Sequence, residues 1–383
     1  MKWPIFGIIF LMVSTASMVT ASLPSRISAR GTPEIMAKTV GPLAMPYGWT
    51  NLPRSNGRIS NARSMVTGGC RATGHISRGY RRDKIEIQPR PVQSILLVRE
   101  SKRNDAPYLA KQVYAVPSDH AIGDGLFAYE GVGWESERIA YRLYLDERNV
   151  VDIFGKKRSA PVLHRIGQGQ DDYHKPAAWG MDILKVGQSM GIGGLGVMRA
   201  GKATQLGPAK ISAETIDDGG RCAAVAITSD AIAGTNARLV THYSITAGSN
   251  VTQVNASLTG GELPLVAGIV KHAGVYILAY QPDQPGWSYI ATWGRQSLAE
   301  DGLGLALFYR SDSVKSGVID DDQSLFVVFS DPKQIEYRFA AVWEQGQNGV
   351  TNAAQFQRYL RHQAAVMNRQ TGASGRVQNR RLW

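Results

Sequence analysis

The chain has 383 residues, a net charge of +12 and a hydrophobic fraction of 43%, which is ordinary for a globular protein with a sizeable core. The positive charge is peripheral: residues 22–105 carry 15 Lys/Arg against 5 Asp/Glu, and residues 368–383 carry four arginines and no acid. Residues 106–367 therefore have a net charge of −3. Nucleic-acid binding needs a basic face on the folded part of a protein, so this distribution argues against a nucleic-acid partner.

The first 21 residues have the pattern of a secretory signal peptide. Lys2 supplies the positive charge, residues 5–13 form a short apolar run, and Val19-Thr20-Ala21 offers a cleavage site of small residues. No later segment has the roughly 18 consecutive apolar residues that a membrane-spanning helix needs. We therefore expect an exported chain, periplasmic or secreted, without a membrane span.

Residues 22–90 form a basic segment of low order that is rich in Arg, Gly, Ser and Pro. They show neither strand alternation nor a helical apolar stripe. Two interpretations stay open: an exported linker, or a stretch corrupted by a shifted reading frame. The two cysteines, Cys70 and Cys222, form neither a disulfide framework nor a zinc site, and they are either one disulfide or two separate thiols.

From residue 91 the pattern changes to short apolar runs, most of them separated by Gly, Asn, Asp or Pro. Many strands with little helix between them predict a mainly β fold, a large antiparallel β-sandwich over residues 91–368. The predicted strands cover residues 94–99, 110–116, 138–146, 150–154, 221–228, 237–245, 251–258, 265–271, 275–280, 287–293, 304–309, 324–329 and 335–343.

One helix is predicted near the end of the chain. Thr351 or Asn352 can cap it, and apolar residues from Phe356 to Met367 recur at roughly helical spacing. We expect this helix to pack on the sandwich. A basic tail, residues 369–383, follows it.

The stretch 129–142 combines carboxylates, arginines and large aromatic rings around two glycines. Alternation in the strand 138–146 places Arg142 and Tyr144 on one face, with Trp134 and Glu135 in the loop before it. Arg142 can hold a substrate carboxylate, Tyr144 can line the same cleft, and Trp134 can stack under a sugar ring. Glu135 or Glu137 can act as general base or bind hydroxyls. The alternative is that these residues are strand ion pairs and core.

The stretch 171–185 holds the best acid–base candidate, His174, because histidine titrates near neutral pH. Tyr173 is its neighbour, and Asp171 or Asp172 can fix its tautomer. The stretch also contains substrate-binding candidates on what is expected to be one helical turn, with Asp182 and Lys185 on the same side. The alternatives are a surface histidine and a local Asp182–Lys185 salt bridge. The candidates on that turn are Trp179, Asp182 and Lys185.

The other motifs give weaker indications of function. Residues 191–196 match G-x-G-x-x-G, but Gly201, Gly207 and Pro208 break any following helix, so we expect a glycine-rich loop and no dinucleotide. His120 precedes the first stretch and is a candidate for the same cleft as His174, as are His242 and His272. No spacing matches a calcium or zinc site, so no metal and no cofactor are predicted.

The two stretches together resemble domain-of-unknown-function family 4861, a group of exported bacterial proteins, over residues 91–368. The similarity rests on Asp124-Gly125-Leu126, Tyr129-Glu130-Gly131, Gly133-Trp134-Glu135-Ser136, residues 141–146, residues 152–157, Tyr173-His174 and residues 179–187. It implies the large β-sandwich of aldose-mutarotase-like and polysaccharide-lyase-like proteins. Members occur among genes for the breakdown of acidic plant or algal polysaccharides, pectin especially. Residues 22–90 depart from the family, whose members have further strands there.

We therefore expect a carbohydrate-active enzyme that acts on uronate-containing, pectin-like oligosaccharides by β-elimination. Arg142, with Lys185, would neutralise the substrate carboxylate, and His174 or Tyr173 would remove the C5 proton. Tyr173, His120 or Glu135 would protonate the leaving oxygen. The alternatives are a glycoside hydrolase that pairs Glu135 with Asp171 or Asp182, a mutarotase-like epimerase, and a non-catalytic sugar-binding module.

Overall fold

Alternating burial along neighbouring strands shows how this sequence forms sheets. In β12 (Arg238–Thr246) and β13 (Val251–Thr259) every second side chain is buried, among them Leu239, Tyr243 and Val254. This period of two is what a strand with one face on a core requires. The computed structural model describes residues 92–99, 106–169, 172–217, 220–347 and 349–378. The predicted signal peptide, residues 22–90 and Cys70 lie outside this part of the chain.

The largest sheet has nine antiparallel strands in the order β15-β16-β17-β20-β13-β12-β11-β10-β3. A single 3-10 turn, η1 (Ile232–Gly234), follows β11. Besides β12 and β13, its strands are β3 (Val113–Ala115), β10 (Lys210–Asp217), β11 (Cys222–Asp230), β15 (Tyr276–Tyr280), β16 (Trp287–Arg295), β17 (Gly302–Arg310) and β20 (Ile335–Trp343).

Two smaller sheets form the opposing layer, and a parallel bridge between Val151 and Gly191 links them. The six-stranded sheet has the order β2-β1-β4-β5-β6-β7, with β1 (Val92–Arg99), β2 (Tyr108–Ala110), β4 (Phe127–Ser136), β5 (Ile139–Tyr144), β6 (Val151–Lys156) and β7 (Gly180–Asp182). The five-stranded sheet has the order β18-β19-β14-β8-β9, with β8 (Ile192–Arg199), β9 (Lys202–Gln205), β14 (Leu265–Val270), β18 (Ile319–Asp320) and β19 (Ser324–Val328).

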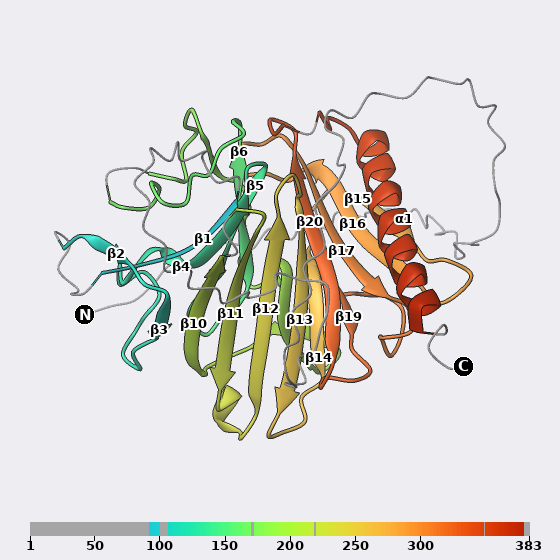
Figure 1. The fold of residues 1–383 in the computed structure, drawn as a ribbon, viewed down its shortest axis with the longest axis horizontal. Helices are drawn as coiled ribbons and strands as arrows, with labels where there is room; N and C mark the ends of the chain where they lie inside the picture. The colour runs from blue at the N-terminus through green and yellow to red at the C-terminus, as the bar shows by residue number, and fades with distance from the viewer. Residues whose placement is uncertain (1–91, 100–105, 170–171, 218–219, 348, 379–383) are drawn as a thin grey trace, which may run out of the picture. The chain divides into compact units, whose positions relative to one another are not determined.

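The core lies between these layers. Strands β1 and β4 contact β10 to β12, while β8 and β14 contact β17 and β20; in Figure 1, β10 to β13 lie in front of β4 and β5. Trp134 of β4 stacks on Tyr243 with ring centroids 5.0 Å apart, and its indole nitrogen donates to Thr252 at 3.0 Å. Full burial of such a ring stabilises the fold by roughly 1.5–3 kcal/mol. The predicted antiparallel sandwich is confirmed.

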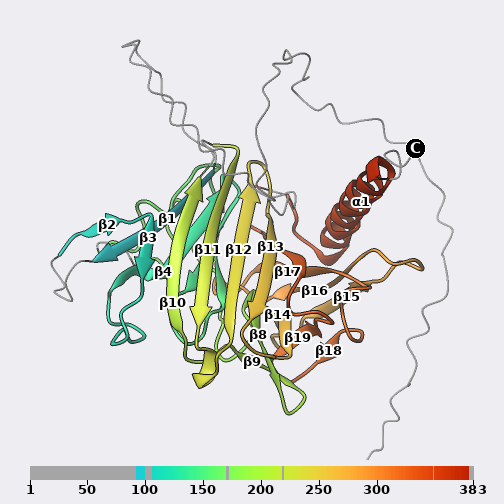
Figure 2. The same ribbon diagram turned by 60° about the horizontal axis from the view of Figure 1, so that its bottom comes forward.

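In the described part of the chain there is one α-helix, α1 (Ala353–Gln378), which covers the outer face of the nine-stranded sheet at β16 and β17, as Figures 1 and 2 show. The side chain of Asn352 accepts a hydrogen bond from the backbone amide of Gln355 at 3.0 Å, which confirms one of the two predicted caps. Phe356 packs on Gly304, where a Cβ atom would come within 2.6 Å of the Phe356 ring. The helix continues beyond Asn368, into the segment that was predicted as a tail.

Three local predictions are wrong. Trp134 and Glu135 lie in β4 and not in a loop, because β4 continues to Ser136 and pairs with β1 and β5. Residues 180–182 form β7 and not a helical turn. The glycine-rich residues from Ile192 onward form β8, where glycine is needed because a Cβ atom on Gly193 would lie 2.2 Å from the Phe339 ring.

Two further observations bear on the predictions. Cys222 is disulfide-bonded, and no cysteine in the described part of the chain is free. Among the described residues, no helix has the length and apolarity that a membrane crossing requires.

Candidate functional site

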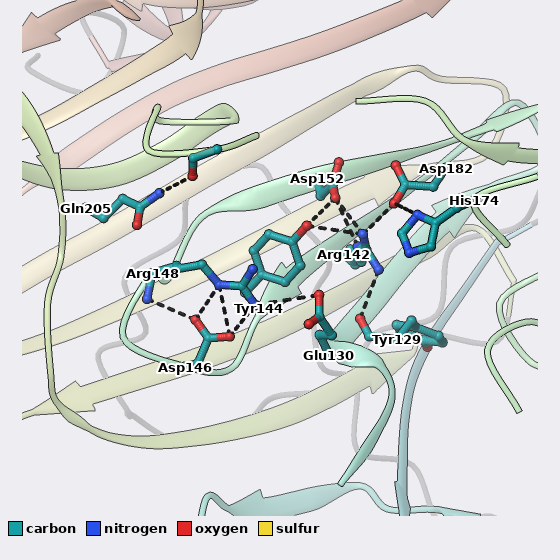
Figure 3. A network of polar contacts seen from close by, with 11 residues as sticks. Tyr129, Glu130, Arg142, Tyr144, Asp146, Arg148, Asp152, His174, Asp182 and Gln205 are labelled. Carbon is teal, nitrogen blue, oxygen red and sulfur yellow. Dashed lines mark hydrogen bonds and ion pairs between the residues drawn. The ribbon is translucent and has the colours of Figure 1, made fainter. Parts of the chain in front are cut away.

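A buried charge cluster lies on the outer face of the six-stranded sheet. Strand alternation in β5 sends Tyr141 into the sandwich core, where its hydroxyl donates to the carbonyl of Asn250 at 2.6 Å, and places Arg142 on the opposite face. The Nη2 atom of Arg142 lies 2.6 Å from a carboxylate oxygen of Asp182 and 2.7 Å from one of Asp152 (Figure 3). All three side chains are almost completely buried.

The charges in this cluster depend on each other. Burial and the neighbouring Asp182 carboxylate raise the pKa of Asp152 to about 6, against the opposing effect of Arg142. Burial alone would lower the pKa of Arg142, but the two aspartates raise it well above its ordinary value. The guanidinium therefore stays charged. It is already held by two carboxyl groups, so its predicted role as a clamp for a substrate carboxylate does not fit this geometry.

His174 connects this cluster to solvent. Its Nδ1 atom lies 3.3 Å from the Asp182 carboxylate, and its side chain is 57% exposed while that of Asp182 is 2% exposed. The hydrogen bond to Asp182 raises the pKa of His174 above its ordinary value of 6.5. Asp182, fixed by Arg142 on one side, thus orients the imidazole on the other and leaves Nε2 as the nitrogen directed away from the pair.

The loop that carries His174 is held at both ends. The carbonyl of Tyr173 accepts a hydrogen bond from the amide of Asp182 at 2.8 Å, and the side chain of Asp172 accepts one from the amide of His174 at 3.2 Å. The Tyr173 ring packs edge-on against Phe154 at 5.6 Å. Burial raises the pKa of the Tyr173 phenol, so this hydroxyl is protonated at neutral pH.

A cavity of about 250 Å³ adjoins His174. Its titratable lining residues are Tyr108, His120, Asp124, Glu130, Asp146, Tyr173 and His174. His120 repeats the arrangement of His174, because its Nδ1 atom lies 3.0 Å from the Asp124 carboxylate. The Nε2 atom of His120 is buried and has no hydrogen-bond partner among the described residues. Two histidines, each bonded to an aspartate, therefore line one cavity, and His120 was one of the candidates for the cleft of His174.

Two carboxylates of the cavity lining, Glu130 and Asp146, belong to a second set of charges. Arg148 lies 2.5 Å from Asp146 and 3.6 Å from Glu130, and its guanidinium stacks 3.7 Å from the centroid of the Tyr144 ring (Figure 3). The Tyr144 hydroxyl donates to Asp152, which joins the two sets. Glu130 has a φ of 64°, a left-handed conformation that is strained for a non-glycine residue and concentrates at functional sites.

Glu135 belongs to a different, sealed ion pair. Its carboxylate lies 2.6 Å from Lys156 Nζ and accepts hydrogen bonds from the amides of Val162 and Leu163, both at 2.9 Å. Neither charged side chain is exposed to solvent. The pair anchors the loop that follows β6. Glu135 therefore has no access to substrate, and the catalytic role predicted for it does not fit the structure.

The remaining predicted residues are scattered. Trp134 is completely buried in the core, so its ring cannot stack on a sugar. Tyr144 is buried between Arg142 and Arg148. Lys185 lies beyond the end of β7 and is exposed. Because a strand and not a helical turn precedes it, the helical spacing that was expected to bring Lys185 and Asp182 to one side does not apply. Trp179 lies at the opposite end of the His174 loop and lines a larger cavity of about 940 Å³.

Sequence reasoning missed Glu130, Asp146, Arg148 and Asp152 as members of the site. The cross-strand register of Arg142 with Asp152 is set by the turn between β5 and β6, and spacing along the chain could have suggested it. The bulge-like conformation of Glu130 had no sequence signal. Among the described residues, no group of three or more His, Cys, Asp or Glu is arranged to hold a metal ion.

Comparison with known proteins identifies the family of this chain but assigns no activity to it. No curated protein matches this chain. The family model described as domain of unknown function (DUF4861) matches residues 85–371, which cover both sandwich layers and most of α1. The match includes every residue of the His120–His174 cavity. The chain therefore belongs to the DUF4861 family.

Proposed function

We propose that this protein is an exported carbohydrate-active enzyme that cleaves uronate-containing oligosaccharides by β-elimination at the His120–His174 cavity. The observation that carries the proposal is the pair of histidines around one cavity, each bonded through Nδ1 to an aspartate. Such a carboxylate fixes the tautomer and makes Nε2 the stronger base. An exposed imidazole oriented by a buried carboxylate is a common arrangement for proton transfer.

In the proposed reaction, neutral His174 takes the C5 proton of the uronate at Nε2. The electrons of the C5–H bond form the C4–C5 double bond, and the C4–O bond breaks. Tyr173, whose phenol is protonated at neutral pH, donates its proton to the leaving oxygen. The proton on His174 returns through solvent to Tyr173, so the enzyme ends in its starting state.

Arg142 supports this reaction indirectly, through Asp182. It holds Asp182 at 2.6 Å, and Asp182 in turn orients His174. Arg142 is thus a positioning residue, and the substrate carboxylate needs other cations.

The direct test is a product assay. β-Elimination gives a 4,5-unsaturated uronate that absorbs in the ultraviolet, and wild-type protein is expected to produce it from at least one member of a panel of pectic and other polyuronate oligosaccharides. Absence of this absorbance across the panel would contradict the lyase proposal.

A second candidate, mutarotase-like epimerisation, is favoured by Glu130, which lines the same cavity in a strained conformation. Glu130 would be the base and His174 the acid. Faster anomer exchange by NMR, without cleavage, would distinguish this reaction from elimination. The hydrolase alternative loses one carboxylate of its predicted pair because Glu135 is buried against Lys156. A sugar-binding module would retain ligand binding and stay inactive in both assays.

A further inference from the structure

We infer that the 940 Å³ cavity beside the proposed reaction centre is a binding subsite for the carboxylates of an acidic oligosaccharide. This inference rests on the proposed function and deepens it, because it supplies the cations that Arg142 cannot. Among the described residues, the charged side chains of its lining are Arg99, Arg158 and Arg165, with His164 beside them and no acidic residue. The volume is within the range of roughly 300–1,000 Å³ that is usual for ligand pockets.

Arg99 is the anchor of this cavity. Its side chain lies on β1 and is 7% exposed, and its guanidinium lies 4.3 Å from the centroid of the Tyr108 ring. The Nε atom is buried and has no hydrogen-bond partner among the described residues. The Arg99 side chain nevertheless lines the cavity, and its positive charge favours a carboxylate bound there.

The two other arginines lie on the loop that follows β6, and both are exposed. The buried Glu135 carboxylate holds this loop, because it accepts hydrogen bonds from the amides of Val162 and Leu163. Arg158 and Arg165 therefore flank a rigid segment. Planar guanidinium groups bind carboxylates in a bidentate geometry, which suits the repeated carboxylates of a polyuronate.

The aromatic residues of the cavity fit a sugar ring. Trp179 is half-buried, with its ring packed edge-on against Phe154 at 6.1 Å, and Tyr108 lines both this cavity and the His120–His174 cavity. Trp179 also lies on the same loop as His174. A chain of sugars held by the arginines is thereby placed next to the reaction centre.

The experiment measures binding without turnover. Calorimetry with the His174→Asn variant uses three matched ligands. They are an oligogalacturonate, its carboxyl-reduced neutral counterpart, and that neutral counterpart with sulfate groups added. The oligogalacturonate is expected to bind at least about tenfold more tightly than the other two, since a hydrogen bond to a charged group contributes roughly 1.5–3 kcal/mol.

Variants then test the residues. Arg158→Ala and Arg165→Ala, placed in the same His174→Asn background, are each expected to weaken oligogalacturonate binding about tenfold and to leave the weak binding of the neutral ligand unchanged. Arg295→Ala, an exposed arginine at the end of β16, is the matched control and is expected to change neither. These exposed sites avoid the folding risk of replacing buried Arg99.

The results of these experiments test the carboxylate subsite separately from the lyase reaction. Equal binding of the charged and neutral ligands, tighter binding of the sulfated one, or unchanged binding by both cavity variants would overturn the carboxylate subsite. Arginine-dependent oligogalacturonate binding by a wild-type protein that forms no unsaturated product would support the subsite and overturn the lyase reaction.

Discussion

Two buried ion pairs on one sheet face behave differently. Glu135 meets Lys156 and two backbone amides, and both charges are sealed from solvent. Asp182 meets Arg142 at nearly the same distance, but its carboxylate also reaches His174, which is 57% exposed. A sealed pair organises a loop, whereas a pair with one exposed neighbour can tune proton transfer. The two clusters therefore differ less in their charges than in whether a neighbouring side chain, such as His174 beside Asp182, is exposed to solvent.

The largest expected effect is on catalysis at the open cluster. Replacing His174 by Asn removes the proposed proton acceptor, so kcat/KM for the unsaturated product should fall by roughly 10²–10⁴-fold. Because the side chain is exposed, stability should change by less than about 1 kcal/mol. Steady-state kinetics and urea unfolding measure the two quantities. Lys175→Ala, at the exposed neighbour, is the control and should keep near-wild-type kinetics.

The sealed pair should respond in the opposite way. Lys156→Met leaves the Glu135 carboxylate buried without its cation, which should lower the free energy of unfolding by about 3–5 kcal/mol. Activity per folded molecule at low temperature should fall much less than in the His174 variant. A Lys156→Met protein as stable as wild type would show that the pair does not anchor the loop.

The pH profile sharpens the same comparison. The raised pKa of His174 means that the imidazole is protonated below a value that lies above 6.5. A base must be neutral, so kcat/KM should decrease about tenfold per pH unit below that pKa and level off above it. Asp182→Asn removes the cause of the shift, so this limb should move to lower pH. An unmoved limb would assign it to another group.

The smallest predicted effect concerns stability against pH. His174 has a higher pKa in the folded chain than in the unfolded one. Its protonated form therefore adds stability that is fully present below pH 6.5 and is lost as the pH rises through the folded pKa. The gain should be under about 1 kcal/mol, because the side chain is more than half exposed. Urea midpoints at pH 6 and pH 8, compared between wild type and His174→Asn, measure this difference.

The sequence predicted the sandwich because alternation is written into strands such as β12 and β13. It also offered His120 as one candidate for the cleft of His174 and Tyr173, and these three residues line one cavity. Trp134 was expected in a loop, as a sugar platform or as core, because a large ring serves either and no strand was predicted over residues 127–136; its ring is buried in the core. Arg142 was found, but its role was not, because the partners Asp152 and Asp182 come from two other strands and only the sheet register unites them.

The central claim is that His174, oriented by Asp182, performs proton transfer on an acidic oligosaccharide. The most direct measurement is the time course of ultraviolet absorbance when wild-type and His174→Asn proteins, both shown to be folded, act on the same oligogalacturonate. We predict a steady rise for wild type and a rate at least about 100-fold lower for the variant. Equal rates for the two proteins would contradict it.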